Sequence, residues 1–250
     1  MLTHGVMTQQ TPGLTLLSGP LSSITTFSPA WYWTLEADST DYGSVGTPLD
    51  VLNGVTTPES APFAEVTYFD DTTDNRRTSS ALTNLSTSWT VGCWFRILAY
   101  TDTNMIVSEH GGNASAFSTR EFAINLVRNA GGDGYYVDLL YFGGGSAYHA
   151  VDSSGDYDVT DSDWHHVACH RSSGKHRIWL DGQLIVTSDA APATVNNSSD
   201  FYMIGQARGG SGSEGLELAH YFHEYGQLTD ANIASIANDP VVGLTYPTWP

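Results

Sequence analysis

The sequence predicts an all-β protein, an antiparallel β-sandwich of jelly-roll type with one short helix near its C-terminal end. Short segments rich in β-branched and aromatic residues recur along the chain, separated by clusters of Gly, Asn, Asp and Ser. This spacing is typical of sandwiches and barrels. The chain has 250 residues, of which 40% are hydrophobic. That is enough apolar material for one continuous core, and it excludes a disordered chain.

The strands follow from these segments. In chain order we expect them at residues 31–35, 63–69, 89–98, 105–108, 122–128, 135–142, 164–171, 176–180, 184–187, 201–204 and 218–225. Ile178 and Leu180 fall on one face of their strand and Trp179 on the other, which is the period of two that a strand requires. The dipeptide Asp181-Gly182 then predicts a two-residue hairpin turn of type I′.

One helix is expected near the C-terminal end. Thr229 can cap it, and Asp230 suits its positive N-terminal end. Ile233 and Ile236 lie three residues apart on one face, and Pro240 ends the helix.

The chain divides into an arm, a body and a tail. Residues 1–28 are almost free of charge and contain Pro12 and Pro20, which disfavour a helix. We expect an extended arm that docks the module onto partner proteins, where its backbone can add to a neighbouring sheet. The alternative is that the arm forms an extra edge strand on its own sandwich. Residues 29–238 form the sandwich, and 239–250 a tail.

The charge of the chain limits its partners. It has 27 acidic against 9 basic residues, and Lys175 is its single lysine. A nucleic-acid binder needs clustered Lys and Arg, so we expect no nucleic-acid partner. No stretch approaches the ~18 apolar residues of a membrane span, so we expect no membrane insertion. Cys93 and Cys169 are too few for a disulfide scaffold and are expected to be reduced and buried.

Several segments together carry a resemblance to a known family. Asp-Trp-His-His-Val-Ala at 163–168 and Ile-Trp-Leu-Asp-Gly at 178–182 resemble the strand and the hairpin of the laminin-G-like family, within the concanavalin-A-like lectins and glucanases. The stretches 30–35, 88–95, 215–225 and 228–236 agree in order, so the resemblance covers about residues 29–238. The resemblance implies that these residues have structural and not catalytic roles. Trp164 is expected to fill the core. His165 and His166 are expected to point to opposite faces of their strand, one of them as a hydrogen-bonded structural histidine.

Some relatives of this fold are glucanases with a Glu-x-Asp-x-x-Glu motif. Glu36-Ala-Asp38-Ser-Thr-Asp41 comes close, and a continuing strand would place Glu36 and Asp38 on one face. Retaining hydrolysis needs two carboxyl groups ~5 Å apart. The third acid is Asp41 rather than Glu, and turn-forming residues follow Asp38. We therefore expect no enzyme, with a glucanase-like glycoside hydrolase as the alternative.

Binding is the favoured function. Loop aromatics and amides can stack on sugar rings and bond to hydroxyl groups, and the candidate ligand-binding residues are Asn113, Tyr148, His149 and Arg208.

No cofactor is required, but Ca²⁺ is a candidate ligand. Asp152, Asp156 and Asp158 form the best cluster of hard oxygen ligands, with solvated surface acids as the alternative.

These observations predict a non-catalytic binding, adhesion or decoration module of a larger assembly, present in many copies or as a homo-oligomer. The first thirty residues show no basic start followed by an apolar run, as an export signal would. A virion protein, assembled in the host cytoplasm and displayed on the particle surface, fits this absence. The partners would be other structural proteins of the particle, through the arm, and a cell-surface glycan. An extracellular location is the alternative.

Overall fold

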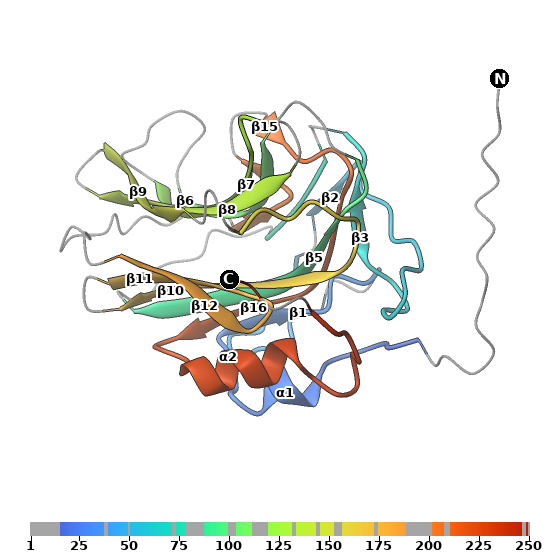
Figure 1. Cartoon of the computed structure of the whole chain (residues 1–250). Coiled ribbons are helices and arrows are strands. Elements are labelled where there is room, and N and C mark those ends of the chain that lie inside the picture. Colours follow the sequence, from blue (N-terminus) through green and yellow to red (C-terminus); the bar gives the residue numbers. More distant parts are fainter. Residues whose placement is uncertain are drawn as a thin grey trace, which may run out of the picture.

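The structure is a computed structural model that gives two packed β-sheets with helices on one side (Figure 1). It describes residues 16–37, 40–49, 51–71, 74–78, 88–99, 104–111, 120–131, 134–143, 146–152, 157–172, 175–188, 202–207, 211–246 and 249.

The first sheet has the order β1-β16-β5-β10-β11-β12, and β3 also pairs with β16. Its strands are β1 (Trp31–Trp33), β16 (Leu216–Tyr225), β5 (Trp89–Ile97), β10 (His165–Ser172), β11 (Lys175–Leu180), β12 (Gln183–Ser188) and β3 (Thr67–Phe69). All these pairings are antiparallel.

The second sheet has the order β2-β4-β13-β6-β7-β8-β9. Its strands are β2 (Val51–Asn53), β4 (Asn75–Arg77), β13 (Tyr202–Ile204), β6 (Met105–Gly111), β7 (Arg120–Arg128), β8 (Tyr135–Gly143) and β9 (Ser146–Asp152). A small hairpin of β14 (Gln206–Ala207) and β15 (Ser211–Gly212) follows β13. The antiparallel sandwich expected from the sequence is therefore confirmed.

Each segment expected as a strand contains one, although the strand within 63–69 is shorter and begins at Thr67. The strands β2, β4 and β9 were not expected. The sequence Asn-Arg-Arg of β4 has no apolar alternation, so nothing local indicates that it pairs.

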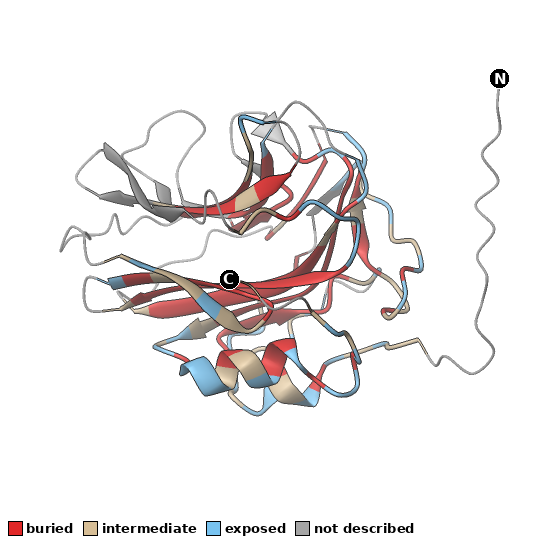
Figure 2. Ribbon diagram, in the orientation of Figure 1, coloured by how far each residue is buried: buried red, intermediate tan, exposed pale blue. Residues whose placement is uncertain are grey.

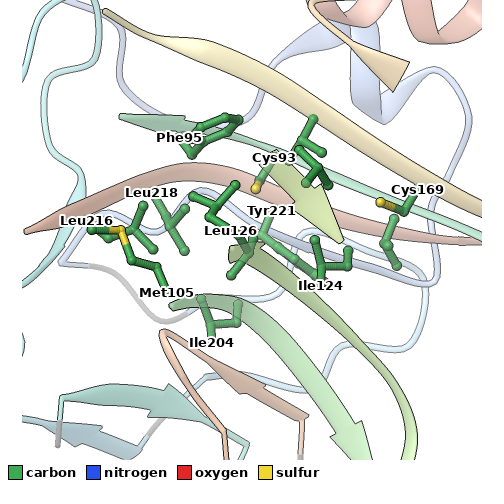
Figure 3. Packing of buried hydrophobic residues seen from close by; sticks show 14 of the residues in the cluster. Cys93, Phe95, Met105, Ile124, Leu126, Cys169, Ile204, Leu216, Leu218 and Tyr221 are labelled. Atoms are coloured by element: carbon green, nitrogen blue, oxygen red, sulfur yellow. The ribbon is translucent and has the colours of Figure 1, made fainter. Parts of the chain in front are cut away.

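An inner core fills the space between the two sheets (Figure 2). Its buried side chains include Trp31, Trp33, Trp89, Cys93, Phe95, Phe122, Ile124, Leu126, Val137, Leu139, Cys169, Ile178, Tyr202, Leu218 and Tyr221. Cys93 and Cys169 lie here among aliphatic and aromatic side chains (Figure 3), and both are free thiols. Burial raises the pKa of both thiols. The prediction that both are buried is confirmed, and their reduced state stays a prediction.

An outer core lies on the opposite face of the first sheet, beneath the helices α1 (Ser22–Thr25) and α2 (Asp230–Ala237). Its buried side chains include Leu21, Ile24, Tyr32, Phe63, Trp94, Trp164, Trp179, Phe222, Ile233, Ile236 and Val242. The first sheet is thus buried on both faces. Trp179 shows the consequence, since it faces away from Ile178 and Leu180, as expected, and is nevertheless fully buried.

The outer core corrects the expectation for the N-terminal arm. Leu17 bridges to Phe63, and Leu21 and Ile24 are buried, with Ile24 on the one-turn helix α1. In the described part of the arm, residues 16–28, apolar groups therefore have a place in the core. The apolar outer face of the first sheet needs cover, and these side chains supply part of it. Residues 1–15 lie outside the described residues.

The chain after α2 also packs on the sandwich. Val242 is buried, and the Tyr246 hydroxyl accepts a hydrogen bond from Trp94 Nε1 at 2.9 Å and donates one to the Ala237 carbonyl at 3.1 Å. Trp249 Nε1 donates to Asp181 Oδ2 at 3.1 Å.

The two strongest local predictions are confirmed. Asp181 and Gly182 have φ angles of 52° and 78°, as a type I′ turn requires. Thr229 caps α2 in a capping box with Asn232, and Ile233 and Ile236 are buried. No helix in the described part of the chain is long and apolar enough to cross a membrane.

Candidate functional site

The two sheets differ in their outer faces. Both described helices cover the first sheet, whose outer face is apolar (Figure 1). On the second sheet, Ile124 and Leu126 of β7 point into the inner core, and Asn125 lies between them on the outer face. In the same way Val137 and Leu139 of β8 point inward and Asp138 outward. The second sheet thus has polar side chains at these two outward positions.

Two polar residues lie side by side on adjacent strands, and we call them the amide–carboxylate row: Asn125 and Asp138. The register pairs Asn125 of β7 directly with Asp138 of β8. Directly opposed residues of an antiparallel pair lie on the same face, with Cβ atoms ~5 Å apart. The row therefore brings together two residues that are 13 positions apart in the sequence.

The described side chains of the row are unusually buried for polar groups on an outer face. Asn125 is 7% exposed and Asp138 is 4% exposed. Asn125 Oδ1 has no hydrogen-bond partner. Buried polar atoms without a partner are rare in folded proteins and need an explanation.

An aromatic side chain accompanies the row. Tyr136 lies two residues before Asp138 on β8, hence on the same face, and is half-buried. An amide, a carboxylate and a phenol ring on one face can donate to hydroxyl groups, accept from them, and stack on a flat apolar surface.

The ligand-binding residues predicted from the sequence are placed only in part. Tyr148 and His149 lie on β9 of the second sheet, opposite Tyr141 and Leu140. Asn113 and Arg208 lie outside the described residues. The sequence prediction did not include Asn125, Tyr136 and Asp138. The signal for Asn125 and Asp138 was present in the sequence, because each lies between two apolar residues that face the core, Ile124 and Leu126 in one strand and Val137 and Leu139 in the next.

The structure places the calcium candidates only in part. Asp152 ends β9, and Asp156 lies outside the described residues. Asp158 accepts a hydrogen bond from the Asn129 side-chain amide. In the described part of the chain, no group of three His, Cys, Asp or Glu side chains could hold a metal ion.

Glu36, the first carboxylate of the glucanase-like segment, does not lie on a strand. β1 ends at Trp33, and Leu35 has a φ of 64°, so the strand does not continue to Glu36. The carboxylate of Glu36 accepts a hydrogen bond from Gly19 N at 2.9 Å. Asp38 lies outside the described residues. The geometry that the motif would require is therefore absent at Glu36.

Asp41, the third acid of that segment, organises a loop. Its carboxylate accepts hydrogen bonds from the backbone N–H groups of Tyr32, Gly43 and Thr47, at 2.8, 2.8 and 2.7 Å. Burial raises the pKa of this carboxyl group. Its contacts are those of a structural anchor.

The paired histidines have different surroundings. His165 faces the inner core beside Phe95, and His166 faces the outer core beside Trp94, so the predicted opposite orientation is confirmed. His165 Nδ1 lies 2.9 Å from Asp181 Oδ2, and Nε2 lies 2.9 Å from Asp161 Oδ1. Burial by itself lowers the pKa of His165, but the hydrogen bonds and charges of the two carboxylates outweigh it and raise the pKa above its ordinary value. His165 is the hydrogen-bonded structural histidine.

This pair gives the first prediction. Replacing Asp181 by Asn keeps the shape and suits the positive φ, but removes the negative charge beside His165. We expect a loss of about 1.5 to 3 kcal/mol in the free energy of unfolding, as for a hydrogen bond to a charged group. Since the pKa of His165 is raised in the folded state, this stabilisation is full below pH ~6.5 and is lost as the pH rises through the folded pKa.

Urea denaturation of the natural and Asp181→Asn proteins at pH 6 and pH 9 measures this effect. The difference in the free energy of unfolding between the natural and Asp181→Asn proteins should be smaller at pH 9 than at pH 6. Asp163→Asn is the control, because Asp163 is an exposed neighbour, and it should leave stability unchanged at both values. A difference independent of pH would show that His165 carries no extra proton in the folded state.

With the fold and this face described, comparison with known proteins defines the class as a concanavalin-A-like β-sandwich. Residues 70–217 match the model of the laminin-G family described as the concanavalin A-like lectin/glucanases superfamily. This is more than half of the chain, and the chain belongs to this family. A search of curated protein sequences found no match.

Solved structures share the fold. Domain 4 of AbnA, an extracellular arabinanase from Geobacillus stearothermophilus, solved in complex with arabinotriose, has a TM-score of 0.65 and 14% identity. The comparison covers 84% of this chain and 98% of that domain. The binding domain of botulinum neurotoxin serotype D has a TM-score of 0.63 and 10% identity, covering 88% of this chain. The serotype D ligand binding domain in complex with N-acetylneuraminic acid has a TM-score of 0.62 and 10% identity, covering 86% of this chain. The chain spans about half the length of these neurotoxin domains, 53% and 52%.

Proposed function

We propose that the protein is a non-catalytic carbohydrate-binding module, and that its sugar site is the outer face of the second sheet around Asn125, Tyr136 and Asp138. The observation that carries the proposal is the amide–carboxylate row together with its half-buried neighbour Tyr136. They lie on the outer face of the second sheet, whereas both described helices pack on the first sheet. The fold shared with an arabinanase domain and with neurotoxin binding domains, whose structures contain carbohydrate ligands, supports the class of ligand.

The chemistry of the row suits a sugar. The ring of Tyr136 can stack on the apolar face of a pyranose or furanose. The amide of Asn125 can donate and accept at once, and the carboxylate of Asp138 accepts from two neighbouring hydroxyl groups. Together they can hold adjacent hydroxyl groups of one sugar ring in a fixed orientation.

Charge favours a neutral glycan. The formal net charge is -18, and the row contains the buried carboxylate of Asp138. An anionic sugar such as a sialic acid would be repelled at such a site, since like charges in a partly buried position interact strongly. We therefore propose a neutral oligosaccharide as the ligand.

A glycan array with the full chain tests the proposal. We expect binding to neutral oligosaccharides and weaker binding to the same glycans carrying sialic acid. Tyr136→Ala should lower the affinity at least tenfold, about 1.4 kcal/mol, because it removes the stacking surface. Asn125→Ala should have a similar effect.

Tyr225→Ala is the matched control, since Tyr225 is a 39% exposed tyrosine at the end of β16 in the other sheet. It should leave glycan binding unchanged. If Tyr136→Ala and Asn125→Ala bind as well as the natural protein, the site lies elsewhere. Hydrolysis of a bound glycan would contradict the non-catalytic reading.

The display of the module in several copies on a virus particle rests on the sequence alone and stays a prediction. Mass spectrometry of purified particles from a producing host would test it.

A further inference from the structure

We infer that the segments covering the outer core form an acid-sensitive lid, which opens locally when the histidines beneath it take up protons. These segments, which we call the cover, are residues 17–27, helix α2 and residues 239–246 (Figure 1). The first sheet separates the cover from the inner core. The inference does not involve the proposed sugar site, which lies on the other sheet.

Three buried histidines lie on the outer face of the first sheet, beneath the cover. His166 and His170 come from β10 and His220 from β16. Each is at most 1% exposed. Each is also linked to an anchor of the cover through a single intervening side chain, so a change at the histidine is one contact away from the cover.

His220 is linked to the N-terminal part of the cover. Its Nδ1 lies 2.8 Å from the Tyr32 hydroxyl, which accepts a hydrogen bond from Leu21 N at 2.8 Å. Because the Tyr32 oxygen accepts from Leu21, its own proton is available for Nδ1. A protonated imidazole is a donor at both nitrogens and no longer accepts this proton. Protonation of His220 therefore disturbs the contact that holds Leu21, directly before α1.

His166 is linked to the C-terminal part of the cover. Its ring lies 4.7 Å from Trp94 and 6.4 Å from Phe222, centroid to centroid, and neither ring nitrogen has a hydrogen-bond partner among the described residues. Trp94 Nε1 donates to the Tyr246 hydroxyl at 2.9 Å. The carboxylate of Asp181 accepts from the backbone N of His166, not from its ring. A charge on this ring requires water, which enters only when the cover moves.

His170 is linked to the start of α2. Its Nδ1 lies 3.4 Å from Thr90 Oγ1, which accepts a hydrogen bond from Leu228 N at 3.1 Å. Arg177 is directly opposite His170 on β11, and Asp230 of α2 lies 3.8 Å from the Arg177 guanidinium. A proton on His170 therefore adds a second positive charge beside Arg177, close to the place where α2 begins.

The sign of the pH effect follows from the surroundings of these groups. Burial lowers the pKa of His166 and of His220 to about 3, and burial together with the Arg177 charge lowers that of His170 to about 4. In the open form each has its ordinary pKa of about 6.5. The closed form is thus favoured above pH 6.5, and each histidine favours opening about tenfold per pH unit below it.

Glu224 acts in the opposite direction. It lies opposite Thr90 on β16, and burial raises its pKa to about 7. Glu224 therefore favours the closed form as the pH falls towards its ordinary pKa, and offsets about one of the three histidines. The net expectation is that the equilibrium constant for opening rises roughly a thousandfold between pH 7 and pH 4.5.

Hydrogen exchange of the full chain at pH 7 and pH 4.5, corrected for the intrinsic rate at each pH, tests the inference. The amides of Ile233, Asn238 and Gly243 are hydrogen-bonded within the cover. Their protection should fall roughly a thousandfold at pH 4.5, with little dependence on urea, because a local opening exposes little surface. The amides of β7, in the second sheet, should remain better protected and should depend more steeply on urea.

Substitutions separate the histidines from general loosening. His166→Phe retains a ring without a titratable group, so its cover amides should be about a hundredfold better protected at pH 4.5 than those of the natural protein. His170→Gln provides a second variant and should also reduce the pH dependence. Phe222→Leu is the matched control: it alters the packing beside His166, and should lower protection by the same factor at both pH values.

Two outcomes overturn the inference. In the first, the amides of Ile233, Asn238 and Gly243 exchange with the same protection and the same urea dependence as those of β7, which would show that only global unfolding exposes them. In the second, His166→Phe and His170→Gln both retain the pH dependence of the natural protein, which would show that these histidines do not control the cover.

Discussion

Trp164→Ala is expected to lower the free energy of unfolding by about 3 to 5 kcal/mol, the range for removing a large aromatic side chain from a packed core. Trp164 is 5% exposed and lies in the outer core. Its ring packs edge-on against Phe63 at 4.9 Å between centroids, and the Arg96 guanidinium lies 5.3 Å from its centroid on the ring face. Its Nε1 donates to the Ala61 carbonyl at 3.0 Å.

The loss in the free energy of unfolding should be at the upper end of that range, because the Trp164 indole also shields the ion pair between Arg96 and Glu217 from water. Arg96 contacts the buried Glu217 through Nε and Nη2, at 2.8 and 2.7 Å. Water entering the space left by Trp164 would weaken this pair.

Denaturation of the purified domain measures the effect. Trp164→Phe retains most of the packing and should cost less than half as much. Tyr225→Ala, at a partly exposed aromatic, is the control for general loss of ring contacts. A Trp164→Ala protein that melts within a degree or two of the natural one would show that the outer core does not depend on this side chain.

The second large effect is expected in acid. His166 and His220 are buried on the outer face of the first sheet, and burial lowers the pKa of each to about 3. Unfolded histidine has a pKa of about 6.5. Between these values the unfolded chain holds a proton at each position and the folded protein does not, so stability is present above pH 6.5 and is lost as the pH falls. Each group contributes about 1.4 kcal/mol per pH unit, and the two together about 2.7.

The uncharged side chains of His166 and His220 have different surroundings. His220 Nδ1 lies 2.8 Å from the Tyr32 hydroxyl, which in turn accepts from Leu21 N. His166 lies 4.7 Å from Trp94 and 6.4 Å from Phe222, ring centroid to centroid, and neither of its ring nitrogens has a hydrogen-bond partner. An apolar ring at position 166 would therefore lose no hydrogen bond.

Between pH 4 and pH 7 the free energy of unfolding should fall less steeply with decreasing pH in His166→Phe than in the natural protein, by the equivalent of about one proton. Acid unfolding should then shift to lower pH. Urea denaturation at intervals from pH 7 to pH 4 measures the slope. Phe222→Leu is the matched control: it changes the packing beside His166 without removing a titratable group, so it should destabilise the protein and leave the dependence of stability on pH unchanged. A His166→Phe protein with the natural slope would show that His166 is protonated in the folded state.

The sequence by itself determined the features that depend on neighbours along the chain. The Asp181-Gly182 turn, the Thr229 cap and the alternation of Ile178 with Trp179 each follow from local backbone geometry. The role of Trp164 and the opposite faces of His165 and His166 followed from the same alternation and from the family resemblance. These predictions required no knowledge of which strands pair.

Only the tertiary structure decided which polar residues meet. Asn125 and Asp138 lie side by side because β7 and β8 pair in one register, and a shift of either strand by a single residue would move its polar side chain to the other face. The arm residues Leu21 and Ile24 are buried because an apolar sheet face needed cover, which their own segment does not reveal. Glu36 leaves the strand because Leu35 adopts a positive φ, a conformation that no preference of leucine predicts. Local propensity is encoded within a few residues, whereas register and burial depend on contacts between segments distant in the sequence.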